Sequence, residues 1–149
     1  MFLSAVLLST SFAVAAAQSP ITQRFDPARD PQRDLWAATD EARAQHKRIL
    51  LDIGGEWCGW CRLLDRTIAG DLQLSEFVTS HFVIVKVNFS EENPNKEFLS
   101  CFPFIFAYPH LFVLDSDGRL LHSQMTDVFE TGGQLDAKRL LEFFQRWAK

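Results

Sequence analysis

The chain has 149 residues, of which 47% are hydrophobic and 23% are charged, and its formal net charge is −4. This length and composition favour one globular domain and exclude a disordered chain. The 15 Lys and Arg residues form no cluster, so a nucleic acid is not an expected partner.

The first seventeen residues carry no charged side chain and are rich in Leu, Val, Ala and Phe. The small residues of Ala13–Ala17 fit a cleavage site, and the apolar run is shorter than the roughly 20 residues of a membrane span. We therefore predict a signal peptide over residues 1–17 and a periplasmic or secreted protein. Retention of this segment as a short membrane anchor is the alternative.

Residues 18–30 are polar and contain two prolines, so they are predicted to form an extended lead-in to a domain over residues 31–149. Asp30-Pro31 is a typical helix start, with an Asp cap and a proline at the first helical position, and the helix is expected to run to His46. The other elements predicted are strands at 48–53, 82–89, 111–114 and 119–123 and helices at 58–69, 72–79, 96–102 and 136–149.

The order of these elements predicts the fold class. Strands alternate with helices and close on a hairpin, whose turn is Asp115-Ser-Asp-Gly118. A hairpin turn is favoured there over a calcium loop, because the EF-hand glycine and glutamate are missing. The expected architecture is α/β, with a mixed central sheet flanked by helices on both faces.

The chain contains three cysteines, Cys58, Cys61 and Cys101. A small domain stabilised by disulfides usually has an even number of cysteines at wide spacing. This chain instead has one close pair and a single further cysteine. The pair follows a predicted buried strand and begins a predicted helix. Because residues i and i+3 of a helix face the same way, the two sulfurs can meet.

The start of a helix favours a thiolate at the first of these cysteines. Unpaired backbone N–H groups and the positive end of the helix dipole stabilise the negative charge. The thiolate is the nucleophile of disulfide exchange. We therefore predict that Cys58 attacks a substrate disulfide and that Cys61 resolves the mixed disulfide. No organic or metal cofactor is needed, since the pair carries the electrons.

A static disulfide and a zinc site are the other interpretations of the pair. Zinc needs further ligands, but the four His residues are dispersed and Cys101 alone does not complete a set, so no metal site is expected. Two other functions stay open. The chain could be a binding or chaperone module in which the cysteines are secondary, or a protein that handles metal through two thiolates.

The segment Leu51-Asp-Ile-Gly-Gly-Glu-Trp-Cys-Gly-Trp-Cys61 resembles the active-site segment of the thioredoxin superfamily, and the leader resembles its exported branch. The resemblance covers residue 35 to the C-terminus. It implies a thioredoxin fold and a protein disulfide oxidoreductase that acts on protein thiols and disulfides. It also implies a recycling redox partner, for which a membrane-bound protein is one option.

Further positions match this family residue by residue. Asp52, six residues before Cys58, matches the buried acid behind the pair, whose raised pKa would let it exchange a proton with Cys61. Lys86 matches the lysine that can pair with this acid. Pro109 matches the cis-proline that faces the disulfide and leaves the preceding backbone free to pair with a substrate. The residues implied to contact substrate are Trp57, Gly59, Trp60, Tyr108 and Pro109.

Three other features are interpreted as structural. Cys101 is expected to be a small buried hydrophobe, and His110 a surface histidine. The phenylalanines at positions 98, 102, 104 and 106 are expected to belong mostly to the core. The alternative for these rings is an exposed apolar rim near Pro109 that receives unfolded or peptide substrates.

Overall fold

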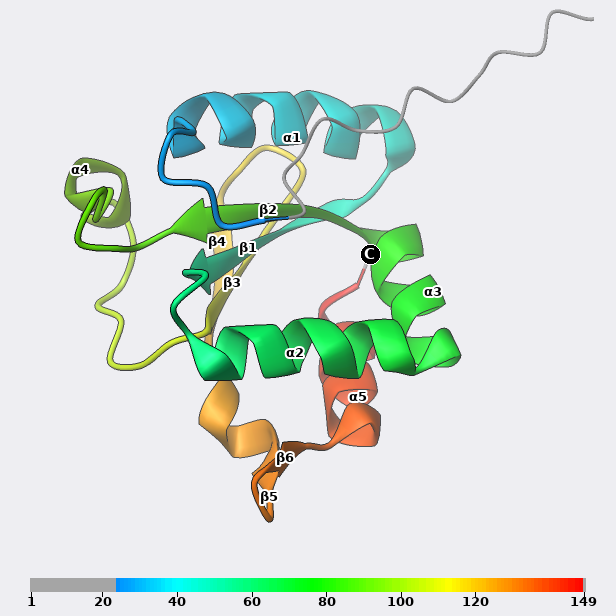
Figure 1. Cartoon of the computed structure of the whole chain (residues 1–149). Helices are drawn as coiled ribbons and strands as arrows, with labels where there is room; N and C mark the ends of the chain where they lie inside the picture. The colour runs from blue at the N-terminus through cyan, green and yellow to red at the C-terminus, as the bar shows by residue number, and fades with distance from the viewer. Residues whose placement is uncertain (1–23, 149) are drawn as a thin grey trace, which may run out of the picture.

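The computed structural model describes residues 24–148, in which a mixed sheet lies between two layers of helices (Figure 1). The predicted signal peptide and the lead-in as far as residue 23 lie outside the described residues. Within residues 24–148, no helix is both long and apolar enough to cross a membrane. The elements are α1 (Pro31–Gln45), β1 (Arg48–Gly54), α2 (Gly59–Gly70), α3 (Leu72–His81), β2 (Phe82–Asn88), α4 (Lys96–Leu99), β3 (His110–Leu114), β4 (Leu120–Met125), a 3-10 helix (Thr126–Phe129), β5 (Glu130–Thr131), β6 (Gln134–Leu135) and α5 (Ala137–Trp147).

The main sheet has the strand order β2-β1-β3-β4. β1 pairs with β2 in parallel and with β3 in antiparallel orientation, and β3 pairs antiparallel with β4. α1 covers one face of this sheet, and α2, α3 and α5 lie on the other (Figure 1). The predicted α/β architecture with a mixed sheet and helices on both faces is confirmed.

The 3-10 helix and a small hairpin of β5 and β6 stand between the strand predicted at 119–123 and the helix predicted at 136–149, where no further element was predicted. Strands of two residues are too short to show a hydrophobic period. Gly132 and Gly133 have φ angles of 60° and 78°. This left-handed backbone at both central residues is what a tight two-residue hairpin turn requires, and glycine adopts it without strain.

The alternation of side chains along β1 divides the core between the two helical layers. Ile49, Leu51 and Ile53 pack with buried residues of α1 in one apolar cluster. Leu50 packs in a second cluster with residues of α2, α3 and α5. By the same period of two, Asp52 lies on the face covered by α2, and this places a carboxylate behind the helix that carries the cysteines.

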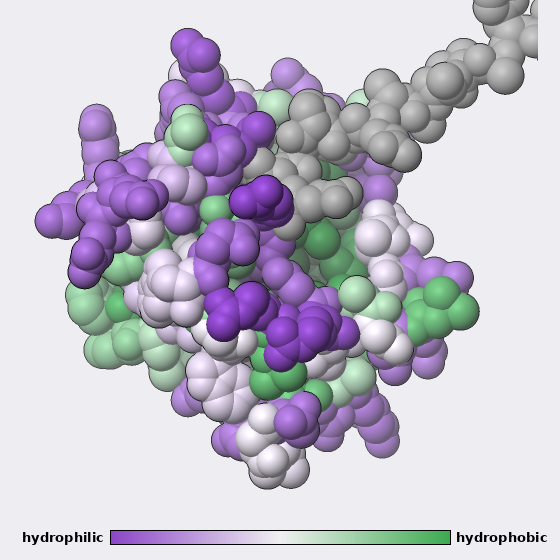
Figure 2. Space-filling view, viewed as in Figure 1, coloured by the Kyte–Doolittle hydropathy of each residue, from purple (hydrophilic) through white to green (hydrophobic). Residues whose placement is uncertain are grey.

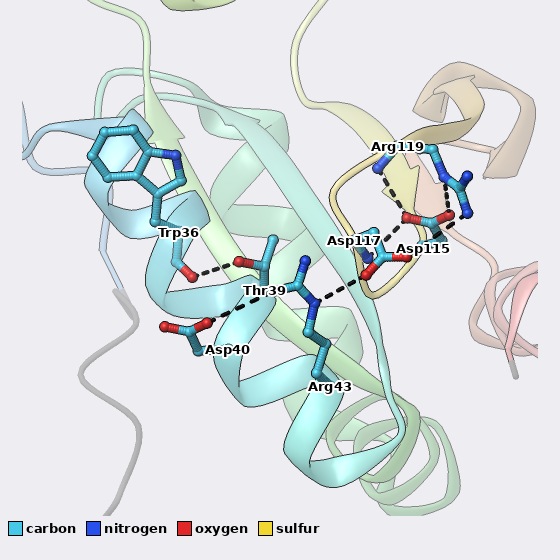
Figure 3. A network of polar contacts seen from close by, with 7 residues as sticks. All are labelled: Trp36, Thr39, Asp40, Arg43, Asp115, Asp117 and Arg119. Carbon is cyan, nitrogen blue, oxygen red and sulfur yellow. Dashed lines mark hydrogen bonds and ion pairs between the residues drawn. The ribbon is translucent and has the colours of Figure 1, made fainter.

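The amino end of α1 is capped as predicted, because the Asp30 side chain accepts hydrogen bonds from the backbone N–H groups of Gln32 and Arg33. Its carboxyl end is tied to the turn between β3 and β4, where Arg43 Nε donates to Asp117 Oδ1 at 2.9 Å (Figure 3). Within this turn, the Asp115 carboxylate accepts the N–H groups of Asp117 and Arg119 and the Arg119 Nε (Figure 3). The hairpin turn predicted here is present.

Replacing Asp117 by Ala is expected to lower the free energy of unfolding by at most about 1 kcal/mol, because exposed ion pairs contribute little. The side chains of Arg43 and Asp117 are 55% and 54% exposed. Asp115→Ala is expected to cost more, since its carboxylate accepts backbone N–H groups inside the turn. Urea denaturation of both variants tests this order. A larger loss for Asp117→Ala than for Asp115→Ala would contradict it.

Candidate active site

The two paired cysteines form a disulfide at the amino end of α2, with their Cα atoms 5.2 Å apart. Cys58 is the N-cap of this helix, and its Sγ accepts the backbone N–H of Cys61 at 3.1 Å. Residue exposure is 4% for Cys58 and 0% for Cys61. The helix thus begins one residue later than predicted, because Cys58 acts as its cap. Its sulfur lies where a helix N-terminus stabilises a thiolate.

Gly54 and Gly55, the two glycines before the motif, have neighbouring atoms too close to leave space for a side chain. A Cβ atom on Gly54 would lie 2.4 Å from Cys61 Sγ. A Cβ atom on Gly55 would lie 2.2 Å from Trp57 Nε1 and 2.9 Å from the Phe89 carbonyl oxygen. Real Cβ atoms do not come this close, so both positions leave room only for hydrogen. Sequence reasoning gave these glycines no role, although a Gly-Gly pair at the end of a buried strand signals a close contact.

The start of α2 lies at the end of the sheet where β1 and β2 terminate (Figure 1). Aromatic side chains gather there beside the disulfide. Trp57 is 57% exposed and donates its indole N–H to the Phe89 carbonyl at 2.7 Å. Its ring meets Tyr108 edge-on, and Tyr108 stacks on Phe89 with 4.8 Å between ring centroids. Tyr108 also packs against the buried cluster of Phe25, Cys58 and Cys61. Trp57 and Tyr108 are therefore brought together beside the disulfide.

The other residues proposed to contact substrate are placed as follows. The peptide between Tyr108 and Pro109 is cis, as the resemblance implied. Pro109 is buried, and its carbonyl accepts a hydrogen bond from Thr126 Oγ1 at 2.9 Å. Trp60 is half-exposed on the first turn of α2. A Cβ on Gly59 would meet only the end of a flexible arginine side chain, so no steric reason for glycine exists there.

On the face of the sheet that α2 covers, a buried lysine lies between two carboxylates. Asp52 and Lys86 are neighbours across β1 and β2, and both are buried. Lys86 Nζ is 3.0 Å from Asp52 Oδ2 and 2.5 Å from Asp65 Oδ1 on α2. Sequence reasoning missed Asp65, although its position four residues after Cys61 puts it on the same helix face. A cavity of about 130 Å³ is lined in part by these three side chains.

Burial sets the protonation of this group. It raises the pKa of Asp52, an effect that the positive charge of Lys86 opposes and the negative charge of Asp65 reinforces. Burial also disfavours the charged form of Lys86, but the two carboxylates outweigh it and raise the pKa of this lysine. Asp52 Oδ1 is buried and has no hydrogen-bond partner among the described residues. Asp52 therefore has the environment of a carboxyl that can hold and release a proton.

The raised pKa of Asp52 predicts how stability depends on pH. Because the folded protein holds this proton to a higher pH than the unfolded chain does, the free energy of unfolding falls as the pH rises from the ordinary value, 3.8, through the raised pKa. Asp52→Asn removes this effect. The variant is expected to be more stable than the parent at pH 7 and to exchange disulfides roughly tenfold more slowly.

Urea denaturation between about pH 4 and pH 8 measures both the stability gain and the flatter profile. The matched control is Asp40→Asn, which removes an exposed carboxylate of α1 and is expected to keep the pH slope of the parent. If the parent gains stability relative to Asp52→Asn as the pH rises across this range, the raised pKa of Asp52 is contradicted.

Phe25, in the predicted lead-in, forms part of the site. It forms one buried cluster with Cys58 and Cys61, and its ring centroid lies 4.2 Å from Lys86 Nζ. Its backbone N–H donates to Glu56 Oε1 at 3.0 Å. Sequence reasoning missed this residue, and its only signal was a large apolar side chain isolated in a polar stretch.

The structure corrects three expectations near the site. His110 is not at the surface but is buried on β3, between β1 and β4, with its Nε2 atom 2.8 Å from Ser123 Oγ. Burial lowers the pKa of His110, and the charge of His122 lowers it further. Cys101 is exposed rather than buried. Phe98 is buried, but Phe104 and Phe106 are both 76% exposed, because the loop that carries them leaves the sheet.

The mixed sheet with a Cys-x-x-Cys disulfide at the start of α2 defines a class, the thioredoxin-fold proteins with a redox disulfide. Residues 30–116 match the thioredoxin-like family, and the chain belongs to that family.

The curated relatives are thiol:disulfide interchange proteins DsbD. The protein of Pseudomonas fluorescens is 28% identical over 117 residues, which are 78% of this chain and 18% of the relative. That of Pseudomonas sp. is 28% identical over 138 residues, 89% of this chain and 22% of the relative. The chain thus spans about a fifth of the length of these relatives. It is distantly related to them.

Solved structures confirm the thioredoxin fold. The disulphide isomerase of Xylella fastidiosa Temecula1 superposes with a TM-score of 0.71 at 22% identity, over 82% of this chain and 94% of that one. The C-terminal domain of DsbD from Neisseria meningitidis, in its oxidised form, gives 0.60 at 18% identity, over 79% and 96%. At these identities the likeness establishes the fold.

Proposed function

We propose that this chain exchanges a Cys58/Cys61 dithiol and disulfide with protein substrates in an exported compartment. The observation that carries the proposal is the position of the Cys58 sulfur at the N-terminus of α2, where it accepts a helix N–H. The buried carboxyl of Asp52 lies on the face of the sheet that α2 covers and can exchange a proton with the second sulfur.

The reaction moves two electrons and two protons. The Cys58 thiolate attacks one sulfur of a substrate disulfide, so that a Cys58–substrate bond forms and the other substrate sulfur leaves as a thiolate. Cys61 gives its proton to the Asp52 carboxylate and attacks Cys58 Sγ, which forms the Cys58–Cys61 disulfide and releases the second substrate sulfur as a thiolate. The two substrate thiolates take up the two protons that the cysteines have lost, so the substrate is reduced to a dithiol and this chain is oxidised. The reverse sequence oxidises a substrate.

Exposed aromatic surface supports a protein as the substrate. A groove of about 500 Å³ runs along the loop before β3, and Phe89, Phe102, Phe104, Ile105 and Tyr108 are among its lining residues. Hydrophobic side chains gather over the loop from α4 to β3, at the left of Figure 2. Because Tyr108 belongs both to this groove and to the surroundings of the disulfide, an apolar substrate segment can lie across both.

The compartment and the recycling partner are parts of the same proposal. The apolar leader over residues 1–17 supports export. Each turnover leaves the pair in the opposite redox state, so a second redox protein, membrane-bound among the options, must restore it. The names of the curated relatives, thiol:disulfide interchange proteins, support this type of partner.

A binding or chaperone module is the second candidate, and the exposure of Phe104 and Phe106 favours it. The double variant Cys58→Ala/Cys61→Ala separates the two functions. If it still suppresses aggregation of an unfolded protein, binding does not depend on the cysteines.

Reduction of insulin by dithiothreitol, followed by turbidity, tests the proposed function. The protein is expected to accelerate precipitation of the insulin B chain, and Cys58→Ser is expected to match the uncatalysed rate. A parent protein with intact thiols that neither reduces insulin nor oxidises a reduced substrate would overturn the proposal. Metal analysis of the reduced protein decides whether the two thiolates bind metal instead.

A further inference from the structure

A groove of about 670 Å³ opens beside the disulfide, on the side of the loop that follows β2. Its aromatic walls are Phe25, Trp57 and Phe89. Phe25 belongs to the buried cluster that contains both cysteines, and Trp57 directly precedes Cys58. The groove therefore borders the proposed site of disulfide exchange.

Among residues 24–148, the charged side chains that line this groove are all acidic. They are Glu56, Glu91 and Glu92, and no lysine or arginine of that range lines it. Glu91 and Glu92 are exposed in the loop after β2. Within residues 24–148 none of the three forms an ion pair. The groove thus combines aromatic faces with a rim of three carboxylates outside ion pairs. The nearby cations make other contacts: the Arg62 guanidinium donates to the Glu56 backbone carbonyl, and Lys86 Nζ lies 4.2 Å from the Phe25 ring centroid and pairs with Asp52 and Asp65.

This combination fits a cationic side chain. A guanidinium or ammonium group is attracted to the face of an aromatic ring, and carboxylates at the rim pair with the same charge. Arginine suits both contacts best, because its planar group stacks on aromatic rings and pairs with carboxylates. An acidic substrate segment would be repelled by the same rim.

We propose that the groove binds a basic side chain of the substrate protein, arginine in preference to lysine, close in sequence to the cysteine that exchanges with Cys58. The inference rests on the proposed function and adds the substrate class to it. The cation and the reacting disulfide belong to one segment, because Trp57 borders both the groove and the motif. The groove thereby selects substrates whose redox cysteine has a basic neighbour.

The test compares two synthetic peptides that contain the same disulfide and differ at one position, two residues from a cysteine. One carries arginine there and the other carries citrulline, its neutral isostere. The kcat/KM of the reduced protein is expected to be about tenfold higher for the arginine peptide at low ionic strength. The preference is expected to shrink as salt is added.

Two double variants of equal charge identify the groove as the cause. Glu91→Gln/Glu92→Gln is expected to remove most of the preference. Glu76→Gln/Glu142→Gln, which neutralises exposed acids on α3 and α5, is expected to keep it. Reduction of the neutral compound hydroxyethyl disulfide is expected to be the same in all of them.

Three results would overturn the inference. Equal kcat/KM values for the two peptides would show that the cation is not recognised. Equal loss of preference in both double variants would assign the effect to the net charge of the protein. Failure to reduce either peptide or hydroxyethyl disulfide would contradict the proposed function itself, and the inference with it.

Discussion

Replacing Cys58 by Ser is expected to lower the rate of disulfide exchange at least about 10³-fold, because a hydroxyl cannot form the mixed disulfide. Cys61→Ser is expected to be equally inactive in turnover, but for another reason. Cys58 can still attack the substrate, and the product of that attack cannot be resolved. The two variants therefore differ in what accumulates.

A non-reducing gel distinguishes them. Cys61→Ser, mixed with a disulfide-containing substrate protein, is expected to form a covalent complex that dithiothreitol releases, whereas Cys58→Ser forms none. The exposed Cys101 provides the control, since Cys101→Ser is expected to leave the exchange rate unchanged. If a complex forms with Cys58→Ser and not with Cys61→Ser, Cys61 is the nucleophile and Cys58 the resolving cysteine, the reverse of the roles proposed.

Gly54→Ala is expected to destabilise the oxidised protein by about 1–3 kcal/mol or more, because the added methyl group overpacks a rigid site. The methyl carbon would lie 2.4 Å from Cys61 Sγ and 3.1 Å from the Phe25 ring. The backbone cannot retreat easily. Gly54 pairs with Asn88, and its carbonyl accepts the N–H of Phe89. Either the disulfide or the end of β1 must move.

Gly70→Ala is the matched control. Gly70 ends α2, and nothing lies within 4 Å of the position of an added Cβ atom. This substitution is expected to leave stability unchanged or to raise it by up to about 1 kcal/mol, since alanine favours the helix. Thermal and urea denaturation of the oxidised proteins measure both effects. Equal stabilities of the two variants would mean that Gly54 is not held in close contact with the disulfide.

Patterns within a few residues of one another predicted much of the fold and of the reacting pair. The cap at Asp30, the strand at 48–53 and the Cys58/Cys61 spacing depend on neighbours along the chain, and each is present in the structure. Asp52 and Lys86 lie 34 residues apart, and the resemblance to a family, rather than a local pattern, related them. The structure places these two in contact.

The remaining site residues depend on contacts between distant parts of the chain. Phe25 meets the cysteines and Glu56 from more than thirty residues away, and no local period marks such a contact. For Phe104 and Phe106, the sequence-based prediction of burial was wrong. Their apolar character predicted burial, but no helix or strand covers their loop, so hydrophobicity alone did not decide their exposure.

The position of Phe25 also bears on where the autonomous folding unit starts. If the chain were cut just before α1, the remaining residues would include every helix and strand. They would lack the Phe25 ring, which is buried in one cluster with Cys58 and Cys61. Removing a buried phenylalanine side chain costs about 3–5 kcal/mol in other proteins. The Arg29 guanidinium, which pairs with Asp34 of α1, would be lost with it. The minimal stable fragment therefore includes a few residues that belong to no regular element.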